Sequence, residues 1–474
     1  MRALLVRRRI LAAALAAAVA GCALKAPPTT DELQKQALPH TTSPAAWKAA
    51  GGEAAPVADR WLASFNDPAL SALVAEALAY NADLQVAAAR VEQAVGYVKV
   101  ARGSLLPSVG VVGMVGDKSG SGAGGLEGIF LNASLELDVW GRLRYGSAAA
   151  EAQSAAMAAD FAYARQSLAA TAAKSWFVAI EAGLLRAIAQ EGLRASETLS
   201  QIAQDRYRVG SGNEQAVAEA RANVATFRDS LRQIDLSREQ ALRALELLLG
   251  RYPAAEIEVA PRLSPMPPPA PAGMPSQLLE RRPDVVAAER RVAGAFNRVG
   301  EARAAQLPRI SLTAGGSSIS SELYVLKNRD NPVWSVGANL VAPLYQGGAL
   351  RARVEIRSAE QKQAVAEYAR AGQRAFGEVE NALSAENALR ERGAILDGAV
   401  RDNERALELA LIQYRVGSID LRTVEARQLA LYSARVSRLR VQSEQLAQRV
   451  NLHLALGGGF EEPAAGPLAA QSGE

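Results

Sequence analysis

Cysteine and histidine are scarce in this sequence of 474 residues. It contains one cysteine, Cys22, and two histidines, His40 and His453. A single cysteine excludes an intramolecular disulfide, and two separated histidines leave no Cys/His cluster with the spacing of a metal site. We also find no nucleophile elbow and no HExxH motif. We therefore predict no enzymatic activity, no metal and no other bound cofactor.

An excess of one charge and long apolar runs are also lacking. Lys and Arg number 53 against 49 Asp and Glu, and four of the basic residues lie within the first 21 positions. The remaining chain is therefore close to neutral, which gives no support for a nucleic-acid partner. Beyond the N-terminus no apolar stretch reaches spanning length without a charge, which argues against a helical membrane protein. A β-barrel stays possible, because alternating strands are nearly invisible to hydropathy.

The N-terminus has the layout of a secretory signal. A basic segment precedes an apolar run at residues 10–20, which is shorter than the roughly 20 residues of a spanning helix. The run ends in VAGC at residues 19–22, which resembles the bacterial lipobox. The resemblance implies that residues 1–21 are removed, that Cys22 receives N-acyl and S-diacylglycerol groups, and that Ala23 directs the chain to the outer membrane. The alternative is an apolar signal that ends in Cys by chance.

The chain consists of two similar halves. Residues 82–107 and 283–308 agree at ten of 26 positions, and YRVG occurs at both 207–210 and 414–417. Eight prolines at residues 253–275 separate the halves. We expect a lipid-anchored extended tether at 22–60, a first repeat at 61–252, a Pro-rich linker at 253–275, a second repeat at 276–458 and a flexible tail at 459–474.

Both halves predict the same order of elements. A helix (66–104, then 276–305) precedes two β-rich runs, a long helix (147–208, then 347–415) and a return helix (214–249, then 420–456). Apolar residues on the return helices follow the 3-4 spacing of a coiled coil. Gly210 and Gly417 suit the left-handed position that ends a helix. A plain antiparallel helical hairpin fits the same periodicity.

Four short runs predict strands. Residues 129–140 and 334–342 alternate strictly between apolar and polar, and 109–115 and 310–318 are weaker partners. The polar positions are Asn132, Ser134, Glu136, Asp138, Ser335 and Asn339. A soluble β-sandwich with one solvent-exposed face fits this pattern. The expected location in the outer membrane instead favours a barrel with these residues facing its lumen. Four strands cannot close a barrel, and open edges are not tolerated in lipid, so several chains must contribute.

Segments spread over the whole mature chain resemble the outer membrane factor family of tripartite efflux systems. They are residues 61–94, 135–144, 275–292 and 342–355, including LELDVWGRLR and APLYQGGALRARVE. The resemblance implies a mainly α fold, in which a long coiled-coil α-barrel adjoins four strands per chain that complete a trimeric 12-stranded β-barrel. It implies a passive outer-membrane exit duct, gated at the periplasmic hairpin tips. The implied partners are two further copies, a periplasmic adaptor, an inner-membrane transporter of the resistance-nodulation-division type, and outer-membrane lipid.

The resemblance also carries site residues. Family tips dock the adaptor, which makes Val209, Gly210, Val416 and Gly417 the docking candidates. The remaining candidates belong to the gate: Tyr414, Glu425, Asp420, Arg422, Glu214 and Gln215. Tyr414 matches the gate tyrosine, and Glu425 matches an acidic position before Ala. The spacing from Gly417 to Ala426 is one residue shorter than that from Gly210 to Ala220, so we expect the second corner to differ in geometry.

Other readings remain open at this point. A structural periplasmic coiled-coil lipoprotein would need no polar-faced strands, and the exit duct of a type I protein secretion system would share the fold. GSGAGG at residues 120–125 fits a nucleotide-binding pattern, but it lies between two predicted strands and reads as an extracellular hairpin loop. The transported compound cannot be read from the sequence, although five methionines and two histidines argue against a copper-handling duct.

Overall fold

The computed structural model describes residues 24–41, 44–49, 57, 59–114, 127–320 and 333–460. Cys22 and Ala23, the Gly-rich loop at 120–125 and the tail from 461 onwards lie outside the described residues. Predictions made for them are therefore carried forward as predictions.

The first predicted helix of each half is divided in two. After the short helix η1 (Trp61–Phe65), α3 (Pro68–Tyr80) and α4 (Ala82–Gly103) are separated by Asn81. Asn81 has an extended backbone, and its Oδ1 accepts a hydrogen bond from the Leu84 amide at 3.1 Å, which starts a new helix. In the second half, η2 (Pro275–Gln277) and α7 (Leu278–Arg281) precede α8 (Pro283–Ala304). Pro283 keeps the preceding Arg282 extended, which breaks the helix there.

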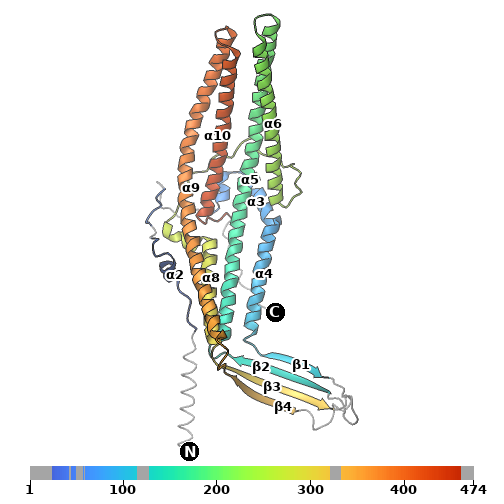
Figure 1. The fold of residues 1–474 in the computed structure, drawn as a ribbon, viewed down its shortest axis with the longest axis vertical. Coiled ribbons are helices and arrows are strands. Elements are labelled where there is room, and N and C mark those ends of the chain that lie inside the picture. The colour runs from blue at the N-terminus through green and yellow to red at the C-terminus, as the bar shows by residue number, and fades with distance from the viewer. Residues whose placement is uncertain are drawn as a thin grey trace, which may run out of the picture. The chain divides into compact units, whose positions relative to one another are not determined.

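The four strands form one antiparallel sheet in the order β1-β2-β3-β4 (Figure 1). Their bounds are β1 (Ser108–Met114), β2 (Glu127–Leu137), β3 (Arg309–Ser320) and β4 (Val333–Val341). The central pair, β2 with β3, joins strands from the two halves. The expectation that Asp138 belongs to a strand is wrong. Its carboxylate accepts hydrogen bonds from the amides of Leu143 and Arg144 at 2.9 and 3.0 Å and so caps the following helix.

The two helical hairpins are equal in length. Helices α5 (Arg142–Arg208) and α9 (Ala349–Arg415) have 67 residues each, and α6 (Glu214–Leu248) and α10 (Leu421–Ala455) have 35 each. Each return helix runs antiparallel to its long helix (Figure 1). Gly210 and Gly417 have φ of 74° and 79°, and Asn213 and Asp420 cap the return helices. Each cap follows its glycine by three residues, so the expected shortening of the second corner is absent.

Among the described residues, one helix is long and apolar enough to cross a membrane by length and composition alone. This helix is α5, in which a stretch of 18 residues has a mean hydropathy of 1.3. Half of this stretch is buried within the protein. Its residues Ala172, Ala173, Trp176, Phe177 and Ile180 contribute to a hydrophobic core. The apolar composition of α5 is therefore explained by its packing in this core.

The sequence repeats and the compact units of the fold do not coincide. Unit 1 comprises Met1–Thr42, Ala88–Asp160 and Asp284–Gly372, and unit 2 comprises Ser43–Ala87, Phe161–Pro283 and Gln373–Glu474. Each unit therefore takes segments from both repeats. The cause is visible in the sheet of unit 1, where β2 pairs with β3 across the repeat boundary.

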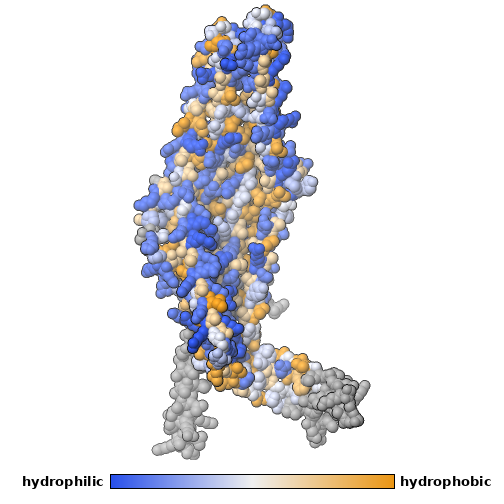
Figure 2. Space-filling model, viewed as in Figure 1, coloured by the Kyte–Doolittle hydropathy of each residue, from blue (hydrophilic) through white to orange (hydrophobic). Residues whose placement is uncertain are grey.

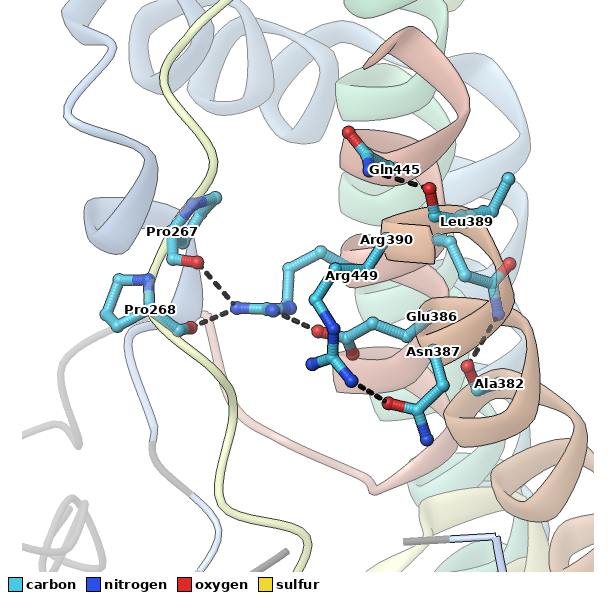
Figure 3. A network of polar contacts seen from close by, with 10 residues as sticks. Pro267, Pro268, Ala382, Glu386, Asn387, Leu389, Arg390, Gln445 and Arg449 are labelled. Carbon is cyan, nitrogen blue, oxygen red and sulfur yellow. Dashed lines mark hydrogen bonds and ion pairs between the residues drawn. The ribbon is translucent and has the colours of Figure 1, made fainter. Parts of the chain in front are cut away.

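The Pro-rich linker forms neither helix nor strand at residues 251–274, and it is fastened to the helices of unit 2. Arg449 of α10 is buried and donates to the carbonyl oxygens of Pro267 and Pro268 (Figure 3). The same guanidinium group forms an ion pair with Glu386 of α9. One side chain thus connects the linker with two helices.

The segment predicted to be an extended tether contains a helix, α2 (Thr30–Ala37). A capping box between Thr29 and Glu32 starts it, and Leu33 is buried. Thr30 donates a hydrogen bond to Glu289 of α8 at 3.3 Å, within unit 1. The local capping signal explains a helix in a segment whose overall composition suggested none.

Candidate functional site

The sheet of unit 1 has one polar and one apolar face. Residues opposite each other in an antiparallel pair share a face. Ser134 pairs with both Ser108 and Thr313, and Asn339 pairs with Ser311, which in turn pairs with Glu136. The predicted polar residues Asn132, Ser134, Glu136, Ser335 and Asn339 therefore lie on the same face.

The opposite face is apolar and exposed. Exposed side chains on it come from all four strands: Val109, Val111, Ile129, Leu131, Leu137, Leu312, Trp334, Val336 and Leu340. Apolar residues are visible at the surface of the sheet in Figure 2. An apolar patch of this extent needs a partner surface or lipid to cover it.

The corners at the ends of the two helical hairpins lie in unit 2. Val209 and Val416 are 76% and 75% exposed, each directly before its left-handed glycine. Behind them, the hairpins share a small apolar cluster: Leu199, Ala203, Val217, Ala220, Ala410, Tyr414, Leu421 and Val424. Each corner thus exposes one valine next to this shared apolar cluster.

Polar contacts join one hairpin to the other near the corners. The guanidinium group of Arg206 lies 4.1 Å from the centre of the Tyr414 ring and donates a hydrogen bond to the Tyr414 carbonyl oxygen at 3.1 Å. Arg422 donates to the Glu219 carboxylate at 2.9 Å. Tyr414 itself is buried, with 6% exposed. The Arg422–Glu219 contact is exposed, where an ion pair contributes little to stability, whereas the Arg206–Tyr414 contact is part-buried.

Three carboxylates at the corners have shifted pKa values. Burial raises the pKa of Glu425, a hydrogen bond with Asn223 opposes the rise, and the charge of Glu219 adds to it. One carboxylate oxygen of Glu425 is buried without a hydrogen-bond partner. Hydrogen bonds from Gln215 and Arg422 lower the pKa of Glu219, and hydrogen bonds from Thr423 lower that of Asp420. Relative to ordinary carboxylates, protonation is thus favoured at Glu425 and ionisation is favoured at Glu219 and Asp420.

Comparison with known proteins identifies the family. The sequence model described as "Outer membrane efflux protein" matches residues 73–251 and 274–458. The chain belongs to this family. The pyoverdine export outer membrane protein OpmQ of Pseudomonas putida is 31% identical over 447 residues, covering 88% of this chain and 92% of that protein. The cation efflux system protein CusC of Escherichia coli O6:H1 is 30% identical, covering 85% and 88%. The solved structure of the outer-membrane channel OprN superposes with a TM-score of 0.82 at 28% identity, covering 88% of this chain and 97% of that one.

Membership of the outer membrane efflux protein family confirms the main predictions from the sequence. The chain is an outer-membrane exit duct of a tripartite efflux pump, with a long helical part in the periplasm. Its fold combines long coiled helices with a strand part, as expected. Its relatives are channel proteins rather than enzymes and work with an adaptor and an inner-membrane pump.

The structure brings some gate candidates of this efflux protein together and separates others. Arg422 and Gln215 both bond Glu219, whereas Glu214 is exposed in the first turn of α6. Asp420 serves as the N-cap of α10. Tyr414 contacts Arg206, a residue that the sequence analysis did not single out.

The sequence analysis did not identify Arg206, Glu219 and Asn223, because the sequence pattern indicates their contacts only weakly. The two YRVG corners are preceded by different residues, Arg206 and Gln413, and this difference places a cation on one side only. Glu219 lies one helical turn beyond Gln215, but its partner Arg422 is 203 residues away. Cross-hairpin pairing of this kind is not readable from local spacing.

Proposed function

We propose that three copies of this chain close a 12-stranded barrel in the outer membrane, with the polar face of each sheet toward a water-filled lumen. The observation that carries the proposal is the amphipathic sheet of unit 1, whose edge strands β1 and β4 each pair with one neighbour within the chain. A membrane strand cannot leave an edge unpaired in lipid. Pairing β1 of one copy with β4 of the next satisfies both edges.

Labelling of single cysteines tests the orientation of the faces. In a Cys22-free background, cysteines at 132, 134 and 136 are expected to react with a membrane-impermeant maleimide, because the lumen is filled with water. Cysteines at 131, 133 and 135 on β2 are the matched controls and are expected to stay unlabelled in lipid. Equal labelling of the two sets would contradict the barrel and favour a soluble sandwich.

The finer assignments belong to the same proposal. Cys22 carries the acyl anchor, because it is the single thiol behind a lipobox-like sequence. The exposed Val209 and Val416, with Gly210 and Gly417, dock the periplasmic adaptor. The inner-membrane transporter is of the resistance-nodulation-division type. The contacts Arg206–Tyr414 and Arg422–Glu219 hold the entrance closed, and Glu425 contributes a half-buried carboxyl near them.

The cargo follows the transporter rather than the duct. OpmQ is named for pyoverdine export and CusC for cation efflux, yet this chain is similar to both at 31% and 30% identity. A common duct can serve different cargoes when selection occurs at the inner membrane. Conductance of the purified protein in planar bilayers is the direct test of the duct, since a structural coiled-coil lipoprotein would form no channel.

A further inference from the structure

A cationic groove of about 1010 Å³ lies in unit 1, where β3 and β4 meet the helices α8 and α9. Five arginines line it against two glutamates. Two of the arginines already have partners. Arg142 donates to both oxygens of Glu136 at 3.0 and 2.8 Å, and Arg357 donates to Glu360 at 2.8 Å.

The other three arginines are Arg298, Arg309 and Arg353. All three are exposed, and none bonds an acidic side chain in the part of the chain that the structure describes. They come from α8, the start of β3 and the first turns of α9. Guanidinium groups present several donors in a fixed plane, which suits the oxygen atoms of phosphate, sulfate or carboxylate groups.

The groove adjoins the polar face of the sheet. Arg309 alternates along β3 with the positions of Ser311 and Thr313, so it lies on the polar face. Glu136 lies on the same face, and the bonded Arg142 continues from it into the groove. Two separate elements therefore lead from the polar face into the arginine cluster.

Helix α8 separates this groove from the tether. Phe296, Gly300 and Arg303 line a second groove that also contains Lys25, whereas Arg298 and Glu301 line the arginine groove. Residues advance by about 100° around a helix, so these two sets occupy opposite sides of α8.

The position of the tether sets which side of α8 faces outward from the trimer. The Lys25 amide donates to the Tyr145 hydroxyl at 2.9 Å, which fixes the tether in the second groove. An acyl chain on Cys22 would lie in lipid within about 10 Å of Lys25, given the reach of three residues. The side of α8 that carries Arg303 then faces outward, and the side that carries Arg298 faces the lumen.

We infer that the arginine groove is a binding station for anionic oxygen groups on the lumen wall, at the junction of the strands and the periplasmic helices. It takes exported solutes that carry phosphate, sulfate or carboxylate groups. The inference rests on the proposed barrel, because only a closed trimer makes the polar face a conduction path. A trimer places three such grooves around one lumen, and their potentials add.

Ion selectivity of single channels tests this assignment. With purified trimer in planar bilayers under a KCl gradient, Arg298→Gln combined with Arg353→Gln is expected to lower the Cl⁻/K⁺ permeability ratio at least about twofold, because uncompensated positive charge is lost from the lumen. Inorganic pyrophosphate at about millimolar concentration is expected to reduce wild-type conductance and to affect the double variant less. Arg298→Lys with Arg353→Lys keeps the charge but loses the planar donors, so it should retain the permeability ratio and respond less to pyrophosphate.

The matched control is Arg303→Gln, on the opposite side of α8. It removes one charge from the same helix and is expected to leave both readouts at wild-type values. Unchanged selectivity and pyrophosphate response in a conducting double Gln variant would overturn the groove alone. Loss of the trimer in that variant would place the arginines between copies and overturn it as well. A wild-type protein without conductance would contradict the duct, and the groove with it.

Discussion

The buried His453 in unit 2 shows how strongly the surroundings of a side chain change its pKa. His453 lies in the last turn of α10, where a helix end normally favours a cation by about 0.3–1 kcal/mol. It is buried and stacked on Trp61 at 5.6 Å, and its Nδ1 has no hydrogen-bond partner. Burial, together with the charge of Arg449, lowers the pKa of His453 to about 4. Desolvation therefore outweighs the helix end.

The lowered pKa of His453 predicts acid sensitivity of the fold. In the unfolded chain His453 binds a proton below its ordinary pKa of about 6.5, whereas in the folded chain it binds one only below about pH 4. The free energy of unfolding therefore falls as the pH decreases between these two values. We expect a loss of about 2 kcal/mol between about pH 7.5 and pH 5. Thermal unfolding followed by circular dichroism measures it.

Two substitutions control for other titrating groups. His453→Phe removes the titration and should reduce the difference in stability between the two pH values by this amount. His40→Gln, at an exposed position, should leave the difference unchanged. An unaltered pH dependence in His453→Phe would show that other groups cause the acid sensitivity.

At the scale of elements, the repeated corners depend on local caps. Each hairpin ends in a left-handed glycine and restarts three residues later, at Asn213 or Asp420. The Asn213 Oδ1 accepts a hydrogen bond from the Ala216 amide at 2.8 Å, and the Asp420 carboxylate accepts one from Thr423 at 3.0 Å. The cap fixes where the return helix begins.

Removal of one cap is expected to loosen the first turn of α6. Asn213→Ala should cost about 1 kcal/mol of local stability, because the Ala216 amide loses its acceptor. Faster hydrogen exchange of amides at residues 214–217 measures the effect. Asn213→Ser keeps an acceptor and should exchange close to the wild-type rate. Equal exchange in both variants would mean that tertiary contacts, rather than the cap, fix this turn.

At the scale of the whole molecule, the proposed closure of the entrance depends on contacts between the two hairpins. Polar contacts join the two hairpins near the corners and cross between repeats, among them Arg206 with Tyr414, Arg422 with Glu219, and Glu425 with Asn223. The exposed Arg422–Glu219 link is compatible with reversible opening, because exposed ion pairs contribute little to stability.

Breaking both links is expected to open the entrance. Arg206→Ala with Arg422→Ala should raise single-channel conductance and sensitise cells to large antibiotics such as vancomycin. Tyr414→Phe with Glu425→Ala is a weaker test, because phenylalanine keeps both the ring and the carbonyl that Arg206 contacts. Arg208→Ala is the matched control, since Arg208 pairs with Asp205 within its own helix. Wild-type conductance in the double arginine variant would exclude these links as the gate.

The proposed acyl anchor on Cys22 is tested at the same scale. Cys22→Ser is expected to abolish incorporation of radioactive palmitate, because Cys22 is the only thiol in the chain. Detection of the label on the immunoprecipitated protein measures it. Retention of the label in the variant would contradict the assignment of Cys22.

The sequence alone determined the order of elements and their periodicity. The alternation at residues 129–137 and the repeated YRVG corners are local signals, since side-chain direction and glycine conformation depend on neighbouring residues. The limits of this reasoning are also local. Asp138 continues the alternation but caps α5, because an acidic residue suits both roles. Asn81 divides the predicted helix at 66–104, although the composition of that segment does not indicate a break.

Only the tertiary structure decided which distant residues meet. The pairing of β2 with β3 and the link between Glu219 and Arg422 both depend on contacts across the two repeats. The arginine groove gathers side chains from α8, β3 and α9, which are each unremarkable in sequence. Periodicity says which residues share a face of one element, but the partner of that face is chosen by packing with elements far away in the chain.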